Sequence, residues 1–259
     1  MVNKTIYIVT VTHNRLQLLL RAITSVLKQT YTDFEMIIID DSSNNETYKH
    51  MKKTAYPPKI KYIKNISNMG ANYSKNTALS FLSQKKGYVL FLDDDDFLNQ
   101  NCLNIAVRYI KETKANWLIS NRKNMLKSNI YSRFISYVND YLCSKRISGE
   151  ATHIINLDII NSYQLRFLKN IKNGYEFTFF SKLSYYTDAY IYDYDSTITN
   201  GYLIDGLSNN ISMKFSDYLF LIKEIIYLRN KLSEKTKIII LTTLLFLSSK
   251  NLASSYWHY

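Results

Sequence analysis

Four consecutive aspartates follow a short apolar run, and this arrangement constrains the fold more than any other stretch of the chain. The segment Gly87–Leu98 reads GYVLFLDDDDFL, and within it Tyr88–Leu92 has the length and composition of a buried strand. An isolated buried charge is costly, so the carboxylates of Asp93–Asp96 are not expected in the core. We expect them at the end of the strand, where a cation neutralises them.

The spacing of these carboxylates favours a metal site. On an extended segment, Asp93 and Asp95 point to one side and Asp94 and Asp96 to the other. Two carboxylates that converge at the rim of a sheet suit a hard divalent cation such as Mg²⁺ or Mn²⁺. The alternative is a solvated acidic loop. The hydrophobic strand before the cluster, and the lack of Gly, Ser or Asn within it, favour a functional site.

The composition is that of a globular protein with a substantial core. Of 259 residues 46% are hydrophobic, and the 2 Pro and 6 Gly exclude a collagen-like or linker-rich chain. Two cysteines are too few for a disulfide scaffold, and no signal peptide or apolar stretch of spanning length is visible. These features predict a cytoplasmic protein. The net charge of +12 favours anionic partners, although it also serves solubility.

The first part of the chain alternates between strand-like and helix-like patterns, which predicts an α/β fold with a mostly parallel sheet flanked by helices. Strands are expected at Ile6–Thr12, Phe34–Ile39, Ile60–Lys64, Tyr88–Leu92 and Trp117–Ser120. Helices are expected from the N-cap Asn14 to about Gln29, at Ala71–Gln84 and at Asn101–Lys114. A further short helix is expected after the loop at 42–45, and it ends at Lys53. Ligands of such sheets bind beyond the carboxyl ends of the strands, where His13, Asp41 and the four aspartates are expected.

The second half is less regular. Residues 123–149 read as an irregular surface region, followed by a helix at Gly174–Thr187 and a strand at Ala189–Tyr194. Two further helices with strong apolar faces are expected at Met213–Lys231 and Glu234–Ser249. We therefore divide the chain into a domain of residues 1–210 and a helical extension of residues 211–259. The basic, amphipathic extension suits the inner face of an anionic membrane, or packing on the core or on another subunit.

Four short motifs occur in one order: Thr12-His13-Asn14-Arg15, Ile39-Asp40-Asp41-Ser42-Ser43, Asn68-Met69-Gly70 with Ser74-Lys75-Asn76, and the aspartates Asp93–Asp96. The order and spacing of these motifs resemble those of the family 2 glycosyltransferases of the GT-A fold. These are mostly inverting enzymes that use sugar nucleotides. The resemblance covers residues 3–120 well and residues 150–210 loosely.

The resemblance implies roles for the residues that match the motifs. Asp41 would accept a hydrogen bond from the base, and uracil offers the imide N–H that this requires. Thr12 and His13 would line the base pocket, with Asn14 in the same nucleotide-binding turn. Lys75 stands where the family usually has Arg, near the phosphates, and lacks the two-pronged guanidinium.

The acidic cluster would divide its work between the nucleotide and a metal ion. Asp94 would contact the ribose or act as a further metal ligand. Asp95, with Asp93 as the second candidate, would bind Mn²⁺ or Mg²⁺, which bridges the two phosphates. Because the four aspartates are consecutive, the assignment of the metal ligands could shift by one residue along the run.

An inverting transferase also needs a general base for the acceptor hydroxyl. The family often supplies it within a Glu-Asp pair after the sheet domain, where this chain reads Asn173-Gly174-Tyr175-Glu176-Phe177. The resemblance therefore implies that Glu176 is the base, with Asp188 and Asp193 as weaker substitutes. The alternative is a glutamate favoured by the positive end of a helix. His153 lies where the family contacts acceptors, or it is a structural histidine.

The predicted function is metal-dependent transfer of a sugar, with inversion, from a UDP-linked donor to a hydroxyl of a glycan or lipid-linked glycan in bacterial surface-polysaccharide synthesis. A non-catalytic sugar-nucleotide-binding protein and a nucleotidyltransferase are alternatives. The latter would need a Gly-rich phosphate loop, and Val9–Arg15 contains no Gly. Nucleic acid is not an expected partner, because the acidic cluster repels phosphates unless a metal intervenes.

Overall fold

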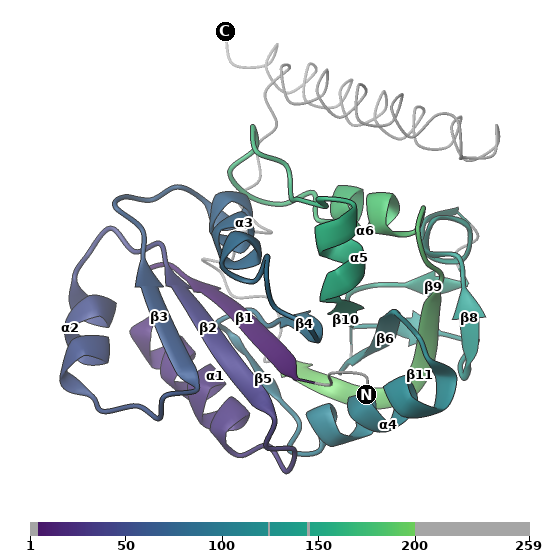
Figure 1. Cartoon of the computed structure of the whole chain (residues 1–259), viewed down its shortest axis with the longest axis horizontal. Helices are drawn as coiled ribbons and strands as arrows, with labels where there is room; N and C mark the ends of the chain where they lie inside the picture. The colour runs from purple at the N-terminus through teal and green to yellow at the C-terminus, as the bar shows by residue number, and fades with distance from the viewer. Residues whose placement is uncertain (1–4, 124, 144–145, 200–259) are drawn as a thin grey trace, which may run out of the picture.

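The computed structural model describes residues 5–123, 125–143 and 146–199 (Figure 1). The two helices expected after residue 211, and with them the boundary at residue 210 and the proposed membrane contact, lie outside the described residues. Within the described ranges, no helix combines the length and the apolar character needed to cross a bilayer.

The secondary structure alternates between strands and helices along the first half of the chain, as expected. The strands are β1 Ile6–Thr12, β2 Phe34–Asp40, β3 Ile60–Lys64, β4 Tyr88–Phe91, β5 Asp96–Leu98, β6 Trp117–Arg122, β7 Lys127–Ser128, β8 Arg133–Ile135, β9 Ile147–Ser148, β10 Ala151–Asn156 and β11 Ala189–Thr199. The helices are α1 Leu16–Leu27, α2 Glu46–Lys53, α3 Ala71–Phe81, α4 Cys102–Thr113, α5 Leu157–Ser162, α6 Phe177–Leu183 and the π-helix η1 Tyr137–Cys143.

One large sheet organises the molecule. Its strand order is β3-β2-β1-β4-β10-β6-β11-β5, and β8 pairs with β11 outside this path. Strands β3, β2, β1 and β4 run parallel, whereas β10 is antiparallel to both of its neighbours, β4 and β6. Because β10 reverses, β6 runs in the same direction as β4. The predicted mostly parallel sheet is confirmed, and the reversed β10 was not predicted.

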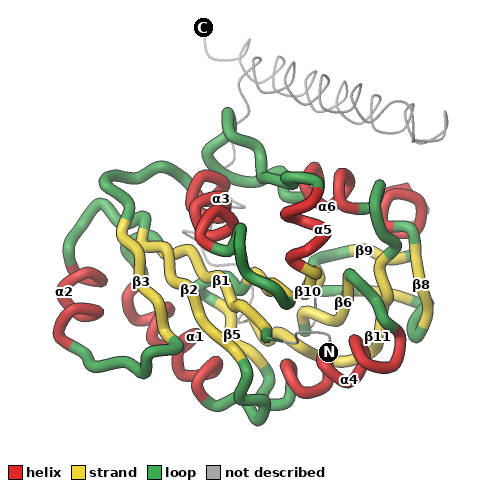
Figure 2. Tube along the Cα trace, in the orientation of Figure 1, coloured by secondary structure: helices red, strands yellow, loops and turns green. Residues whose placement is uncertain are grey.

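Helices cover both faces of this sheet (Figure 2). Along β1, Ile6 and Ile8 pack in a buried cluster with residues of α1 and α4, whereas Tyr7 and Val9 pack with residues of α3, α5 and α6. This alternation follows from the period of two in a strand. Since both faces are buried, β1 reads as a continuous apolar run in the sequence.

Two of the helix boundaries that differ from the sequence prediction have a cause in the backbone. The predicted N-cap Asn14 was wrong: Arg15 occupies that position, and Asn14 has a left-handed backbone with φ of 56°. The predicted helix at 174–187 is reduced to α6, because Gly174 and Tyr175 have φ of 80° and 63°. A right-handed helix cannot continue through such residues.

Candidate active site

The polar ends of three parallel strands meet at one edge of the sheet. The amide of Asp41, after β2, donates to the carbonyl of Thr12 at the end of β1 over 2.8 Å. The amide of Leu92, after β4, donates to the carbonyl of Val9 over 2.9 Å. Strand β6 runs the same way and ends at Arg122, so it brings a cationic side chain to this edge.

The four aspartates form a tight turn, so the predicted alternation on an extended strand was wrong. The amide of Asp96 donates to the carbonyl of Asp93 over 3.2 Å, and β5 begins at Asp96. The turn brings one carboxylate oxygen each of Asp93, Asp95 and Asp96 within 4.8 Å of one another. Asp94 points elsewhere and accepts a hydrogen bond of 2.8 Å from the Thr12 hydroxyl.

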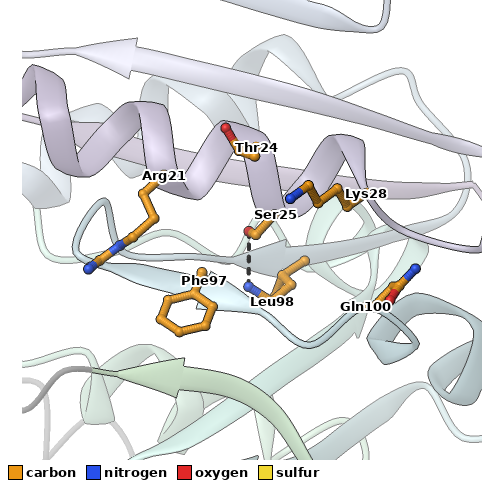
Figure 3. Close-up of a pocket in the computed structure, with 7 residues that line it drawn as sticks. All are labelled: Arg21, Thr24, Ser25, Lys28, Phe97, Leu98 and Gln100. Atoms are coloured by element: carbon orange, nitrogen blue, oxygen red, sulfur yellow. Dashed lines mark hydrogen bonds between the residues drawn. The ribbon is translucent and has the colours of Figure 1, made fainter.

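Helix α1 holds this acidic turn from one side. Arg21 donates to the backbone carbonyl of Asp95, and the hydroxyl of Ser25 accepts from the amide of Leu98 over 3.0 Å. Figure 3 shows Arg21 and Ser25 on α1 facing Phe97 and Leu98 on β5, where they line a pocket together with Thr24, Lys28 and Gln100. These contacts fix the position of the turn relative to β1.

Two arginines supply positive charge beside the four aspartates, as expected from the sequence. Arg15 lies 3.5 Å from a carboxylate oxygen of Asp94 and of Asp95. Arg122 lies 3.4 Å from Asp93 and 2.8 Å from Asp96, and it also contacts Glu150. If all the carboxylates ionise, five negative charges face two guanidinium groups, and the turn keeps an excess of negative charge.

Burial makes the inner aspartates weak acids in the absence of a further cation. Burial raises the pKa of Asp94 to about 7, although the hydrogen bond from Thr12 and the charge of Arg15 act against it. Burial and then the charge of Asp93 raise the pKa of Asp96 to about 7, against the attraction of Arg122. A divalent cation beside these groups would favour their charged forms.

The turn fits a hard divalent cation. Asp93, Asp95 and Asp96 present only carboxylate oxygens, which are the ligands that Mn²⁺ and Mg²⁺ prefer. Among the described residues, the Oδ1 atom of Asp96 is buried without a hydrogen-bond partner. Buried acceptors are rarely left unpaired, so this oxygen points to a missing ligand. Asp96 was not among the predicted metal ligands, whereas Asp93 and Asp95 were.

Asp41 organises the loop at residues 65–70. Its Oδ1 accepts from the Asn65 side chain over 2.7 Å and from the Met69 amide over 2.8 Å, and its Oδ2 accepts from the Gly70 amide over 2.8 Å. A carboxylate has about four lone-pair sites. The loop uses three of them, so one acceptor position is left.

The turn after β1 is tied to the turn after β2. His13 Nδ1 lies 2.8 Å from the carbonyl oxygen of Asp41, which can only accept, so Nδ1 carries the proton. Asn14 donates through its amide to the hydroxyl of Ser42 over 2.8 Å and through its side chain to Ser43 over 2.9 Å. The left-handed Asn14 therefore links the two strand ends, which explains why it does not cap α1.

Lys75 and Glu176, which lie far apart in the sequence, form an ion pair of 3.0 Å. Lys75 belongs to α3, and Glu176 directly precedes α6. The side chain of Asn72 holds the two segments together by donating to the carbonyls of Ile171 over 2.9 Å and Gly174 over 3.0 Å. The structure thus brings the predicted phosphate ligand and the predicted base into direct contact.

The charges of this pair support each other. Burial raises the pKa of Glu176, but the Lys75 ammonium and hydrogen bonds to the carboxylate outweigh burial, so the pKa lies below its ordinary value. Burial lowers the pKa of Lys75, but the charges of Glu176 and Asp93 outweigh it and hold the pKa above its ordinary value. Both groups are therefore charged at neutral pH.

His153 lies in the core. Its ring stacks on Phe180 at a centroid distance of 3.9 Å, and its Nδ1 accepts from the indole of Trp117 over 3.2 Å. Burial lowers the pKa of His153 to about 3. These contacts favour the structural alternative over acceptor contact. Of the substitute bases, Asp188 is exposed, and Asp193 accepts from Asn121 over 2.8 Å.

Sequence reasoning missed the two arginines that form ion pairs with the carboxylates of the acidic turn, Arg15 and Arg122. Arg15 belongs to the Thr12–Arg15 motif, which was assigned to the base, and no role followed for its guanidinium. Arg122 had a usable signal, because it closes a strand whose carboxyl end lies at the same edge as β4. The strand was predicted to end at Ser120, two positions too early to place Arg122 at that edge.

Comparison with known protein families is consistent with this geometry. The sequence model of Glycosyl transferase family 2 matches residues 7–175. The chain belongs to glycosyl transferase family 2. The match begins in β1 and covers the strand-end turns, the loop at 65–70, Lys75 and the acidic turn; it ends one position before Glu176. The predicted family is therefore confirmed.

Two relatives are bacterial glycosyltransferases. The chain is 34% identical to the putative colanic acid biosynthesis glycosyl transferase WcaA of Escherichia coli (strain K12) over 140 residues, 54% of this chain and 43% of that protein. It is 38% identical to the poly(ribitol-phosphate) beta-N-acetylglucosaminyltransferase TarP of Staphylococcus aureus (strain N315) over 120 residues, 45% of this chain and 36% of that protein. These matches span less than half of either relative.

A solved structure confirms the fold. TarS of S. aureus, residues 1–349 in complex with UDP-GlcNAc, superposes with a TM-score of 0.71 at 19% identity and covers 93% of this chain and 71% of that chain. The predicted GT-A fold is therefore confirmed.

Proposed function

We propose that this family 2 protein transfers a sugar from a UDP-linked donor to a hydroxyl of a glycan or lipid-linked glycan, with inversion and with a divalent metal ion. One observation carries the proposal: the acidic turn at the end of β4 gathers three carboxylate oxygens and leaves a buried one without a partner. Such a site suits the ion that a nucleoside diphosphate leaving group requires.

The donor would lie across the carboxyl edge of the sheet. Asp41 has one acceptor position for a uracil imide, beside His13 and Asn14. Asp93, Asp95 and Asp96 would hold Mn²⁺ or Mg²⁺, which when bound neutralises charge on the departing diphosphate. Lys75, on which the charge of Asp93 acts, would add a positive charge for the phosphates. Asp94, whose carboxylate contacts Thr12 and Arg15 of the turn after β1, would face the ribose.

Glu176 would act as the general base. An inverting transfer needs a group that accepts the proton of the acceptor hydroxyl while its oxygen attacks the anomeric carbon opposite the leaving group. A base must be unprotonated before the reaction, and the lowered pKa of Glu176 meets that condition at neutral pH. The contact with Lys75, the expected phosphate ligand, supports this role.

The relatives support the choice of donor and setting. TarS was solved with UDP-GlcNAc, and TarP is named as an N-acetylglucosaminyltransferase. WcaA is named for colanic acid biosynthesis. We therefore propose a hexosyl or N-acetylhexosaminyl donor and a role in surface-polysaccharide synthesis. Action at the cytoplasmic face of a membrane, with contact through residues 211–259, stays a prediction.

Calorimetric titration with UDP tests the metal-dependent donor site. We expect UDP to bind at least about tenfold more tightly with Mn²⁺ than with EDTA, because the ion links the carboxylates to the diphosphate. Asp95→Asn should lose most of this difference, whereas Asp33→Asn, an exposed carboxylate that accepts from Thr5, should keep it. Equal UDP affinity of the wild-type chain in Mn²⁺ and in EDTA would count against the proposal.

A further inference from the structure

We propose that the Lys75–Glu176 ion pair is a latch that donor binding opens. In this scheme the diphosphate of the nucleotide sugar takes Lys75 away from Glu176, and the released carboxylate then serves as the base. The inference rests on the proposed function, because it uses the same donor and the same base. It adds a link between them: the base becomes available when the leaving group is in place.

The geometry gives the pair few other partners. Lys75 Nζ lies 3.0 Å from Glu176 Oε1 and 5.3 Å from the centre of the Phe167 ring. Only 11% of the Lys75 side chain is exposed, whereas 38% of the Glu176 side chain is. Among the described residues, Glu176 supplies the carboxylate within ion-pair distance of Lys75. The lysine is therefore held inside, and the glutamate faces the solvent-accessible side from which an acceptor can approach.

While the ion pair is formed, it weakens Lys75 as a phosphate ligand and Glu176 as a base. A carboxylate that is bound to an ammonium accepts a proton less readily, so paired Glu176 is a weaker base. An ammonium that is bound to a carboxylate has part of its charge neutralised, so a phosphate must compete for Lys75. The two roles are thus available together only after the pair opens.

A diphosphate can win this competition. It carries more negative charge than one carboxylate, and Lys75 offers three donors that can turn toward it. Other charges face the pair: Asp93 and Arg122 bear on Lys75, and the phenol of Tyr137 faces Glu176. Asp93 also attracts Lys75 toward the acidic turn, which is the direction in which the diphosphate would lie.

The affinity for UDP in the presence of Mn²⁺ tests the latch without an activity measurement. Glu176→Gln removes the competing charge, so we expect UDP to bind about three- to tenfold more tightly than in the wild type. Lys75→Met should weaken UDP binding. In the double variant the gain from Glu176→Gln should vanish, because the residue that it released is gone.

Glu112→Gln is the matched control. Glu112 pairs with Arg108 on the exposed side of α4, so this variant removes one carboxylate of an ion pair elsewhere, and UDP affinity should not change. If Lys75→Met does not fold, Lys75→Gln replaces it in the cycle.

Two results would overturn the latch. One is a Glu176→Gln variant that binds UDP no more tightly than the wild type, and the other is a gain that persists without Lys75. Failure of the proposed function differs from both, because a wild-type chain that binds no UDP with Mn²⁺ would refute the donor site itself.

Discussion

Asp41 illustrates how a single side chain at this edge combines structural and ligand-binding work. Three donors of the loop at 65–70 converge on its carboxylate, including the backbone amides of Met69 and Gly70. Hydrogen bonds to a charged group contribute about 1.5–3 kcal/mol each, so this residue fixes the loop before any ligand arrives. A base that binds Asp41 would meet an acceptor already held in position, which lowers the entropic cost of binding.

At the same scale, Glu176 is the residue on which transfer is expected to depend. Glu176→Gln keeps the size of the side chain but cannot accept a proton, so we expect sugar transfer to fall by about 10²-fold or more, although the variant binds UDP more tightly than the wild type. The measurement is release of UDP from UDP-GlcNAc in the presence of an acceptor glycan.

Asp193→Asn serves as the comparison for this variant, because Asp193 was a substitute candidate and is bound by Asn121. We expect it to retain transfer. Full activity of Glu176→Gln together with a loss in Asp193→Asn would move the base to β11. Binding of UDP with no transfer to any acceptor would favour the non-catalytic alternative.

At the scale of elements, the start of α3 is locked onto the segment that precedes α6. The amide of Ala71 donates to the side chain of Asn173 over 2.8 Å, and the amide of Asn72 donates to the carbonyl of Lys172 over 2.9 Å. Gly70 lies at this junction with φ of 93°. An added Cβ atom would lie 2.6 Å from the carbonyl oxygen of Lys172, so only glycine fits.

Gly70→Ala is therefore expected to lower the free energy of unfolding by about 2 kcal/mol or more, from both the backbone conformation and the clash with a backbone atom. Urea denaturation measures the change. Ser80→Ala, an exposed position on the same helix, should stay within about 0.5 kcal/mol of the wild type. Wild-type stability of Gly70→Ala would show that the junction can separate without cost.

The elements also show which parts of the fold the sequence could predict. The bounds of β1 and β3 were predicted to the residue. Strand β1 is an apolar run buried on both faces, and such a run has a local pattern that needs no knowledge of its partners. Strand β10 was missed, because its place between β4 and β6 depends on pairing with segments distant in the chain. Such pairing leaves little trace in a window of ten residues.

The site follows the same division. Its strand-end residues could be placed at one edge from the order of the parallel strands, and Asp93, Asp95 and Asp41 lie there. The inclusion of Asp96 could not be foreseen, since it depends on a turn rather than an extended strand. The Lys75–Glu176 pair joins segments about a hundred positions apart, and only the folded loops bring them together.

At the scale of the whole molecule, the buried His153 links stability to pH. Its pKa of about 3 in the fold lies below its ordinary value of 6.5, so between these values the unfolded chain binds a proton that the folded chain does not. The free energy of unfolding contributed by this group is therefore complete above pH 6.5 and falls as the pH decreases. The loss is about 1.4 kcal/mol per pH unit, or about 2 kcal/mol at pH 5.

His153→Phe isolates this contribution. Asp94 and Asp96 act in the opposite direction, because their raised pKa values let the folded chain keep protons that the unfolded chain releases. The useful quantity is thus the difference in unfolding free energy between wild type and variant. We expect that difference to move by about 2 kcal/mol in favour of His153→Phe between pH 7 and pH 5.

Phe180→Leu controls for packing in this comparison, because it removes the ring stacked on His153 but leaves the histidine. Its difference from the wild type should be similar at both pH values. A difference between wild type and His153→Phe that does not change with pH would show that the imidazole titrates equally in the folded and unfolded chains.

The reversal of β10 has a consequence for how this architecture can diversify. Between Arg122 and Ala151 the chain returns to the sheet through the short strand β8, and Ala151 pairs with Asn121, so the two ends of this segment are neighbours beside the acidic turn. An excursion anchored at two adjacent points can change length at little entropic cost. The stretches on either side of β8 can therefore change in length while the strand ends at the acidic turn keep their spacing.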